Sequence, residues 1–247
     1  MLRERNGTDS ISEFLRYLAQ HEEVNGQRLP ALNKLSDELG VSIASLREQL
    51  EVARAMGLVE VKPRTGMKRL PYSFAPAVRQ SLRYALILSN ENFRKYSELR
   101  NHIESAYWHE AVRLLKDDDK QELQKLLECA KEKLNGNPIQ VPHEEHRKLH
   151  MTIYQRLENP FVRGLLEAYW DAYEAVELNV YNDYRYLEQV WRYHEKMVKA
   201  IQVGDFAAGY QALIEHTGLL SRRPEMSSYP EGSLLKEGQP SVGSEIA

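Results

Sequence analysis

Four of the eight histidines in this 247-residue chain fall on apolar faces of segments with helical periodicity, where imidazoles can bind a metal ion. Two of them, His146 and His150, are four residues apart. The same face carries apolar side chains, namely Leu149, Ile153 and Leu157. Helical side chains four apart emerge from one face, so this pair has the spacing of a helical chelate. A pair of core histidines or a solvated edge would have the same spacing.

The other two histidines lie further along the chain. His194 falls on an apolar stripe with Trp191 and Val198, and His216 shares a face with Leu213. A single buried histidine is more often a satisfied core residue than a metal ligand. Four in one helical region are harder to explain in this way, because unpaired buried imidazoles cost free energy and one shared cation would satisfy all of them. On spacing alone, both interpretations stay open.

Arg100 also faces inward, on the same side as Ile103 and Tyr107. A buried guanidinium needs an anionic partner. A salt bridge to a glutamate on another helix would supply such a partner.

Sequence signatures of the common metal or nucleophilic enzymes are missing. The run at 143–146 is His-Glu-Glu-His, which lacks the spacing of His-Glu-x-x-His, and no Gly-rich phosphate loop or nucleophile elbow occurs. An all-helical metal-dependent enzyme is therefore only an alternative to a binding protein.

The elements that must position these residues are helices. Between about residues 75 and 220 the periodicity predicts helices near 76–88, 92–116, 118–134, 142–157, 160–180, 185–202 and 205–220. Asn159-Pro160 provides an N-cap followed by proline at the first helical position, and Gly204-Asp205 ends one helix and caps the next. We expect an all-helical bundle here.

The first 71 residues have a different pattern. Helical segments at 10–20, 31–40 and 41–57 precede two short β-prone runs around Pro-Arg-Thr-Gly. Gly40 suits the position after a helix, and Ser42 suits an N-cap. Two helices joined by Gly-Val-Ser, followed by a hairpin, predict a winged helix-turn-helix, so the predicted fold is mostly α with a small β wing.

A winged helix binds DNA by placing its second helix in the major groove, while flanking groups contact phosphates. The exposed polar and basic residues, together with the glycine of the wing turn, form the predicted DNA-binding set: Asn33, Lys34, Ser42, Ser45, Arg47, Lys62, Arg64, Thr65 and Gly66. A winged helix used for protein contact is the alternative.

Charge and composition agree with two different domains. Residues 1–71 carry 11 basic and 10 acidic side chains, and four of the basic ones lie within 62–69. The rest of the chain carries 22 basic and 26 acidic side chains. No apolar run approaches the roughly 20 residues of a membrane span. The polar start and the single Cys129 favour the reducing cytoplasm. We predict domains at 1–71 and 72–220, and a disordered tail at 221–247 that is rich in Pro, Gly and Ser.

The first domain resembles the GntR family of bacterial transcription regulators over about 45 residues. The matching features are Leu29-Pro30, Val41-Ser42, Arg47, the Gly-Leu-Val step at 57–59 and the Arg-Thr-Gly wing at 64–66. The chain has Asn33 and Ile43 where the family usually has operator-binding arginines. The resemblance implies DNA binding with an altered operator preference.

The second domain resembles the FCD ligand-binding domain of FadR-type members of that family. A histidine pair precedes Asn159-Pro160, His194 precedes the Gly-Asp turn, and His216 follows 22 residues after His194. The resemblance implies a divalent metal held by His146, His150, His194 and His216, with Arg100 binding a small carboxylate. His146 stands where an aspartate is usual, which favours zinc, nickel or copper over manganese.

These observations together predict a homodimeric repressor that binds a two-fold symmetric DNA operator and responds to a small organic acid at a histidine-bound metal, with zinc or nickel expected. The other candidates are a regulator with a purely structural metal and no effector, and an all-helical metal enzyme.

Overall fold

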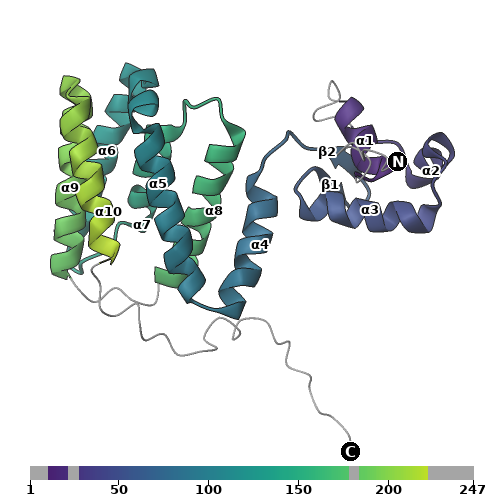
Figure 1. The fold of residues 1–247 in the computed structure, drawn as a ribbon, viewed down its shortest axis with the longest axis horizontal. Coiled ribbons are helices and arrows are strands. Elements are labelled where there is room, and N and C mark those ends of the chain that lie inside the picture. The colour runs from purple at the N-terminus through teal and green to yellow at the C-terminus, as the bar shows by residue number, and fades with distance from the viewer. Residues whose placement is uncertain (1–10, 22–27, 178–183, 222–247) are drawn as a thin grey trace, which may run out of the picture. The chain divides into compact units, whose positions relative to one another are not determined.

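The computed structural model describes residues 11–21, 28–177 and 184–221 (Figure 1). The predicted disordered tail lies outside the described residues, except for Ser221. Two compact units divide the chain between Gln80 and Ser81. Within the described residues, no helix combines the length and apolarity needed to cross a membrane.

The N-terminal unit has the order helix, helix, helix, hairpin that the sequence predicts. Its elements are α1 (Glu13–Gln20), α2 (Leu32–Leu39), α3 (Ile43–Ala55), β1 (Val59–Lys62) and β2 (Gly66–Arg69). The strands pair antiparallel, from Val59 opposite Arg69 to Lys62 opposite Gly66.

Local capping explains the sharp turn between α2 and α3. Gly40 follows α2 in the left-handed conformation, with φ of 64°, which costs glycine little. The Ser42 hydroxyl then accepts a hydrogen bond from the Ser45 backbone N–H at 3.2 Å and caps α3. Both predicted caps are confirmed.

The core of this unit gathers the inward faces of all three helices and the hairpin. Leu46, Leu50 and Ala53 are buried on α3. On α1, Tyr17 is buried, whereas Ile11 is 45% exposed. Ile11 precedes the N-cap Ser12, so it lies outside the helix.

The start of α4 (Ala75–Leu88) lies in the N-terminal compact unit, which extends to Gln80. Gly57, with φ of 70°, packs directly against Pro76. A β-carbon on Gly57 would lie 2.4 Å from the Pro76 ring. This close approach ties the start of α4 to the turn before the wing.

In its described residues, the second unit contains the rest of α4 and six further helices. They are α5 (Glu91–Leu114), α6 (Asp117–Leu134), α7 (His143–Tyr154), α8 (Pro160–Glu177), α9 (Tyr184–Val203) and α10 (Phe206–Ser221). The predicted caps hold: Asn159 accepts from two backbone N–H groups of α8, and Asp205 accepts from Ala208 N–H. Asn159 and Asp205 therefore fix where α8 and α10 begin.

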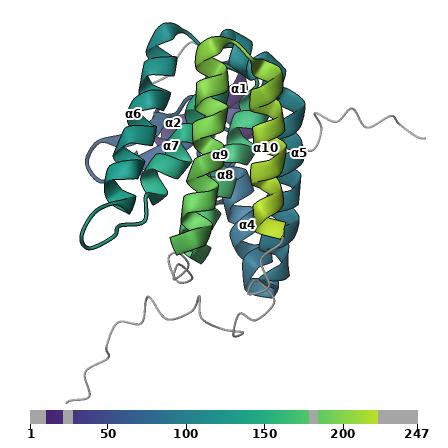
Figure 2. The same ribbon diagram turned by 90° about the vertical axis from the view of Figure 1, so that its left-hand side faces the viewer.

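The main core of this unit lies among α5, α6, α7, α9 and α10, with Val162 and Leu166 of α8 added to it. Helices α9 and α10 run side by side in both views (Figure 2). Gly209 of α10 allows close packing, because a β-carbon there would lie 2.7 Å from the Trp108 ring. Trp108 of α5 also donates its indole N–H to the Phe206 carbonyl at 2.9 Å. These contacts hold the first part of α10 against α5 and α9.

Candidate metal centre

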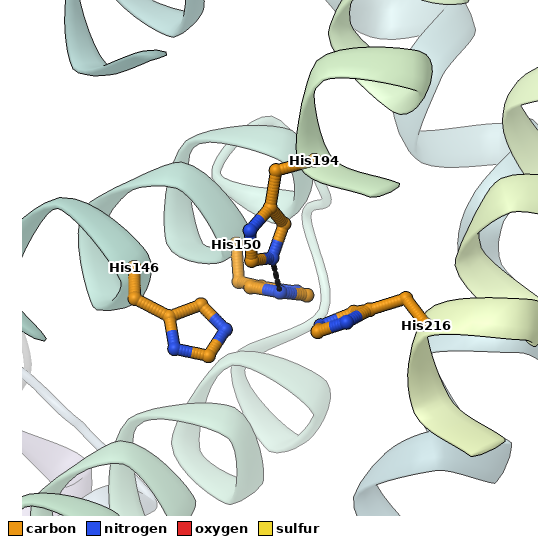
Figure 3. Close-up of side chains that lie close together, drawn as sticks. All are labelled: His146, His150, His194 and His216. Atoms are coloured by element: carbon orange, nitrogen blue, oxygen red, sulfur yellow. Dashed lines mark hydrogen bonds between the residues drawn. The ribbon is translucent and has the colours of Figure 1, made fainter. Parts of the chain in front are cut away.

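Three helices bring the four histidines together. Helix α7 supplies His146 and His150, α9 supplies His194 and α10 supplies His216, and all four side chains are buried (Figure 3). One nitrogen from each ring lies within 4.8 Å of the others. The apolar faces that carry these residues in the sequence are therefore faces of one interior site.

Several imidazole nitrogens in this cluster have no protein partner. The exceptions include His150 Nε2 and His194 Nε2, which lie 3.0 Å from each other. Among the described residues, His146 Nε2, His194 Nδ1 and His216 Nδ1 are buried without a hydrogen-bond partner. Unpaired buried polar atoms cost free energy, and a cation among the rings would satisfy lone pairs that the protein does not. The residues therefore fit a divalent transition metal, for which imidazole is a favoured ligand.

The protonation state of the cluster also suits metal binding. Burial lowers the pKa of all four histidines well below the usual 6.5, and neighbouring cationic groups lower it further. The rings are therefore neutral at neutral pH, which is the form that binds a metal.

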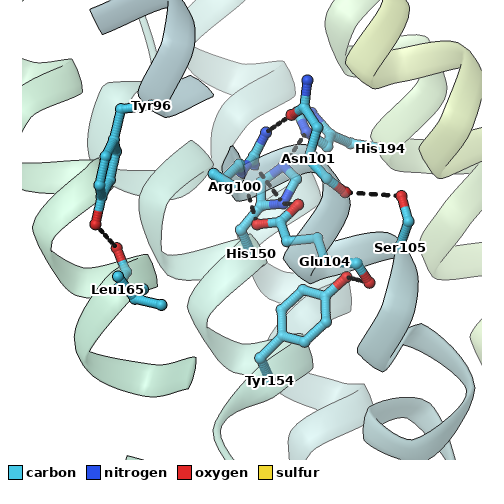
Figure 4. Close-up of polar contacts among 9 residues, drawn as sticks. All are labelled: Tyr96, Arg100, Asn101, Glu104, Ser105, His150, Tyr154, Leu165 and His194. Carbon is cyan, nitrogen blue, oxygen red and sulfur yellow. Dashed lines mark hydrogen bonds and ion pairs between the residues drawn. The ribbon is translucent and has the colours of Figure 1, made fainter. Parts of the chain in front are cut away.

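Arg100 of α5 lies beside the cluster, and protein groups surround its guanidinium (Figure 4). Its Nη2 lies 2.9 Å from His150 Nδ1, and its Nη1 donates to Asn101 Oδ1 at 3.2 Å. The guanidinium also lies over the rings of Tyr169 and Trp170, at 4.8 and 5.1 Å from their centres. Arg100 is thus held rigidly at the edge of the histidine site.

The anionic partner of Arg100 is Glu104, one turn further along the same helix, rather than a glutamate of another helix. Arg100 Nε lies 2.8 Å from Glu104 Oε1, as an ion pair without hydrogen-bond alignment. The second carboxylate oxygen lies 3.1 Å from His150 Nδ1. Burial raises the pKa of Glu104, and the Arg100 charge opposes that rise. Sequence reasoning assigned Glu104 no role, although its i,i+4 spacing from an inward arginine was a usable signal.

A small cavity of about 20 Å³ connects Arg100 to His146 and His216. Tyrosines form much of its wall, namely Tyr169, Tyr173 and Tyr186. This is room for about one water molecule. A larger ligand would require these side chains to move. Glu145 does not reach the site, since it pairs with Lys133 at 2.6 Å.

The predicted DNA-contacting residues of the helix-turn-helix lie on its outer surface or close to it. Asn33 and Lys34 are exposed on α2, and Arg47 is exposed on α3. Ser42 and Ser45 take part in local bonds: Ser42 caps α3, and Ser45 Oγ accepts from the Gln49 amide at 3.2 Å. Of the two arginines of α3, Arg47 lies nearer the start of the helix.

The wing presents the remaining predicted residues in a tight turn. Arg64 and Gly66 both have positive φ, 67° and 83°. Lys62, Arg64 and Thr65 are exposed, and Lys62 pairs with Glu60 at 2.9 Å. Sequence reasoning did not include Arg28, whose Nε would lie 2.9 Å from a β-carbon on Gly66. Its guanidinium adds positive charge to the wing.

Two family models match the two parts of the chain. Residues 15–68 match the gntR family of bacterial regulatory proteins, and residues 96–219, half of the chain, match the FCD domain. The chain belongs to the GntR family. It is a transcription regulator of the GntR/FCD type, a class of DNA-binding proteins rather than enzymes.

Curated relatives of this GntR-family chain are also regulators. It is 23% identical over 206 residues to the uncharacterized HTH-type transcriptional regulator YcbG of Bacillus subtilis, covering 83% of this chain and 84% of the relative. It is 21% identical over 197 residues to the HTH-type transcriptional regulator LutR of the same organism, covering 77% of this chain and 88% of LutR. Among solved structures, Streptococcus agalactiae GntR superposes with a TM-score of 0.63 at 20% identity, covering 85% of this chain and 95% of that one. That similarity supports the fold.

Proposed function

We propose that this regulator is a homodimeric repressor whose operator affinity is controlled by a small carboxylate bound at a metal ion. His146, His150, His194 and His216 would hold the metal, with zinc or nickel expected. The buried histidine nitrogens without protein partners are the observation that carries this proposal. Bound metal would act as a Lewis acid that attracts the carboxylate oxygen of the effector.

The position of Arg100 supports a carboxylate effector. Its side chain lines the same cavity as His146 and His216, so one small anion could contact the guanidinium and reach the metal side of the cavity. Arginine binds carboxylates through paired N–H groups, which gives orientation as well as affinity.

Control of DNA binding follows from differential affinity for two states. An effector changes operator affinity only if it binds the DNA-competent and DNA-incompetent forms of the dimer with different free energies. The predicted DNA contacts are Arg47 and its polar neighbours on α2 and α3, together with Lys62, Arg64, Thr65 and Gly66 of the wing. A two-fold operator would match a dimer of such modules.

A metal with a purely structural role is the second candidate, and one observation favours it. The Arg100 guanidinium already contacts Glu104, Asn101 and His150, so an incoming carboxylate must compete with existing partners. In that case metal would stabilise the domain and no acid would change DNA affinity.

A DNA-binding titration separates the two candidates. Fluorescence anisotropy would follow a labelled fragment from upstream of the chain's own coding sequence, at fixed salt, with zinc-loaded and metal-stripped protein. We expect sequence-dependent binding that a panel of small organic acids weakens only when metal is present. Binding that no acid alters would favour the structural metal, and the absence of any sequence-dependent binding would contradict the proposal.

A further inference from the structure

Every buried carboxylate in the described part of the helical unit already has a cationic partner. Glu104 pairs with Arg100 at 2.8 Å, and Glu145 pairs with Lys133 at 2.6 Å. Asp119 pairs with Arg156 at 2.7 Å. These pairs are each neutral overall, so none has a free negative charge to offer a metal ion.

The histidine cluster adds no negative charge of its own. A histidine binds a metal ion as the neutral imidazole, and Glu104, the carboxylate that contacts His150, is already paired with Arg100. A divalent ion held there would therefore bring two uncompensated positive charges into a buried site. Such a charge is costly unless an anion accompanies it, because water cannot solvate it fully. A carboxylate in place of His146 would cancel one of these charges.

Resting on the proposed function, we infer that the effector of this chain is a dianion, a small dicarboxylate, rather than a monocarboxylate. Two carboxylates neutralise the two charges of the loaded site, whereas one leaves a net positive charge in the protein interior. The cavity lies between the Arg100 guanidinium and the rings of His146 and His216, so a ligand there would contact the arginine and, in the loaded site, lie on the side of the metal ion. The cavity has a volume of about 20 Å³, so a dicarboxylate enters only if the tyrosine side chains of its wall move.

Matched pairs of acids isolate charge from shape. Malonate and succinate would each be compared with its monoamide, malonamate or succinamate, which has nearly the same size and one charge fewer. Isothermal titration of full-length zinc-loaded protein measures each affinity without any DNA. For the wild type we expect the dianion to bind about tenfold or more tightly than its monoamide.

Two variants at one position supply the control. His146→Asp restores a negative ligand and should reduce the preference for the dianion by about tenfold. His146→Asn has nearly the same shape but no charge, so it should retain the wild-type preference. Zinc content is measured for each variant, and comparison is made between proteins that hold equal metal.

The outcomes distinguish this inference from the proposed function. Equal binding of a dianion and its monoamide, with metal present, overturns the dianion inference and leaves the acid-responsive regulator standing. Equal loss of preference in His146→Asp and His146→Asn also overturns it, because the effect would follow shape. If zinc is bound and none of these acids binds, both the inference and the effector half of the proposed function fail. A protein that binds no zinc overturns the metal site itself.

Discussion

Glu104 Oε2 lies 3.1 Å from His150 Nδ1, and neither side chain is accessible to solvent. The same nitrogen lies 2.9 Å from Arg100 Nη2. An imidazole that carries its proton on Nδ1 donates to Glu104 and leaves Nε2 free for a cation. The opposite tautomer accepts from Arg100 and places the proton on Nε2, toward His194. The contact with Glu104 therefore favours the tautomer whose Nε2 is free to bind a metal ion.

Replacing Glu104 with glutamine should weaken metal binding. Glu104→Gln removes the charge that favours the Nδ1–H tautomer and leaves Arg100 without its ion pair, so we expect about tenfold or greater loss of zinc affinity. Competition with a zinc-binding dye measures that affinity. Glu110→Gln, at an exposed position of the same helix, is the matched control and should bind zinc like the wild type. Unchanged affinity in a folded Glu104→Gln protein would argue against the role of Glu104.

The metal-stripped protein should lose stability in mild acid. Burial lowers the pKa of the four histidines well below 6.5, so below that pH the unfolded chain binds protons that the native state does not. The free energy of unfolding then falls as pH falls, by about 1.4 kcal/mol per pH unit for each such histidine. Burial raises the pKa of Glu104, so this side chain takes up a proton more readily in the native state and opposes the loss of stability. It accounts for one proton, whereas the histidines account for four.

Urea denaturation at about pH 7.5 and about pH 5.5 tests this linkage. We expect a clear loss of stability at the lower pH. His102→Gln, at an exposed position, should show the same loss as the wild type, whereas His194→Gln should show a smaller one. Equal stability at the two pH values would mean that the histidines are not buried as neutral groups.

Metal preference should depend on His146. Four neutral imidazoles favour zinc or nickel, and a carboxylate ligand improves the site for manganese. We therefore expect His146→Asp to raise the affinity for manganese relative to zinc by about tenfold. Competition between the two metals, measured by mass spectrometry of the folded protein, gives the ratio directly. A ratio that does not change would exclude His146 from the ligand set.

Arg47 and Arg64 should contribute phosphate contacts in DNA binding. Each alanine variant should weaken binding and reduce the slope of log affinity against log salt by about one. Arg54→Ala is the matched control, because Arg54 is exposed on α3 but pairs with Glu51 at 2.7 Å near the end of the helix. Anisotropy titrations at several salt concentrations measure the slopes. If all three variants behave alike, the assignment of the DNA-binding face is wrong.

Periodicity and capping predicted most of the fold, because the spacing of apolar residues marks the buried face of each helix and the capping residues mark its ends. Ser42, Asn159 and Asp205 cap the helices that the sequence assigned to them. The spacing of apolar residues and the caps do not show how helices pack against one another. The packing of Pro76 on Gly57 is one such contact, because nothing in the local pattern of either segment indicates it.

The same limit applies to the candidate site. The inward faces of the histidines follow from helical spacing, and the structure brings them within 4.8 Å of one another. The sequence did not identify the partner of Arg100, because a guanidinium on a buried face can reach a carboxylate on any neighbouring helix. The position of Glu104 between Arg100 and His150 depends on the packing of α5 against α7.

Metal content is the measurement that tests the central claim most directly. Full-length protein would be purified without a histidine tag, dialysed, and analysed for bound metals beside His194→Ala. We predict about one zinc or nickel ion per wild-type chain and little or none in the folded variant, because a site that loses one of four ligands binds metal much more weakly. A wild-type protein that holds no metal, even after incubation with zinc, would contradict the account.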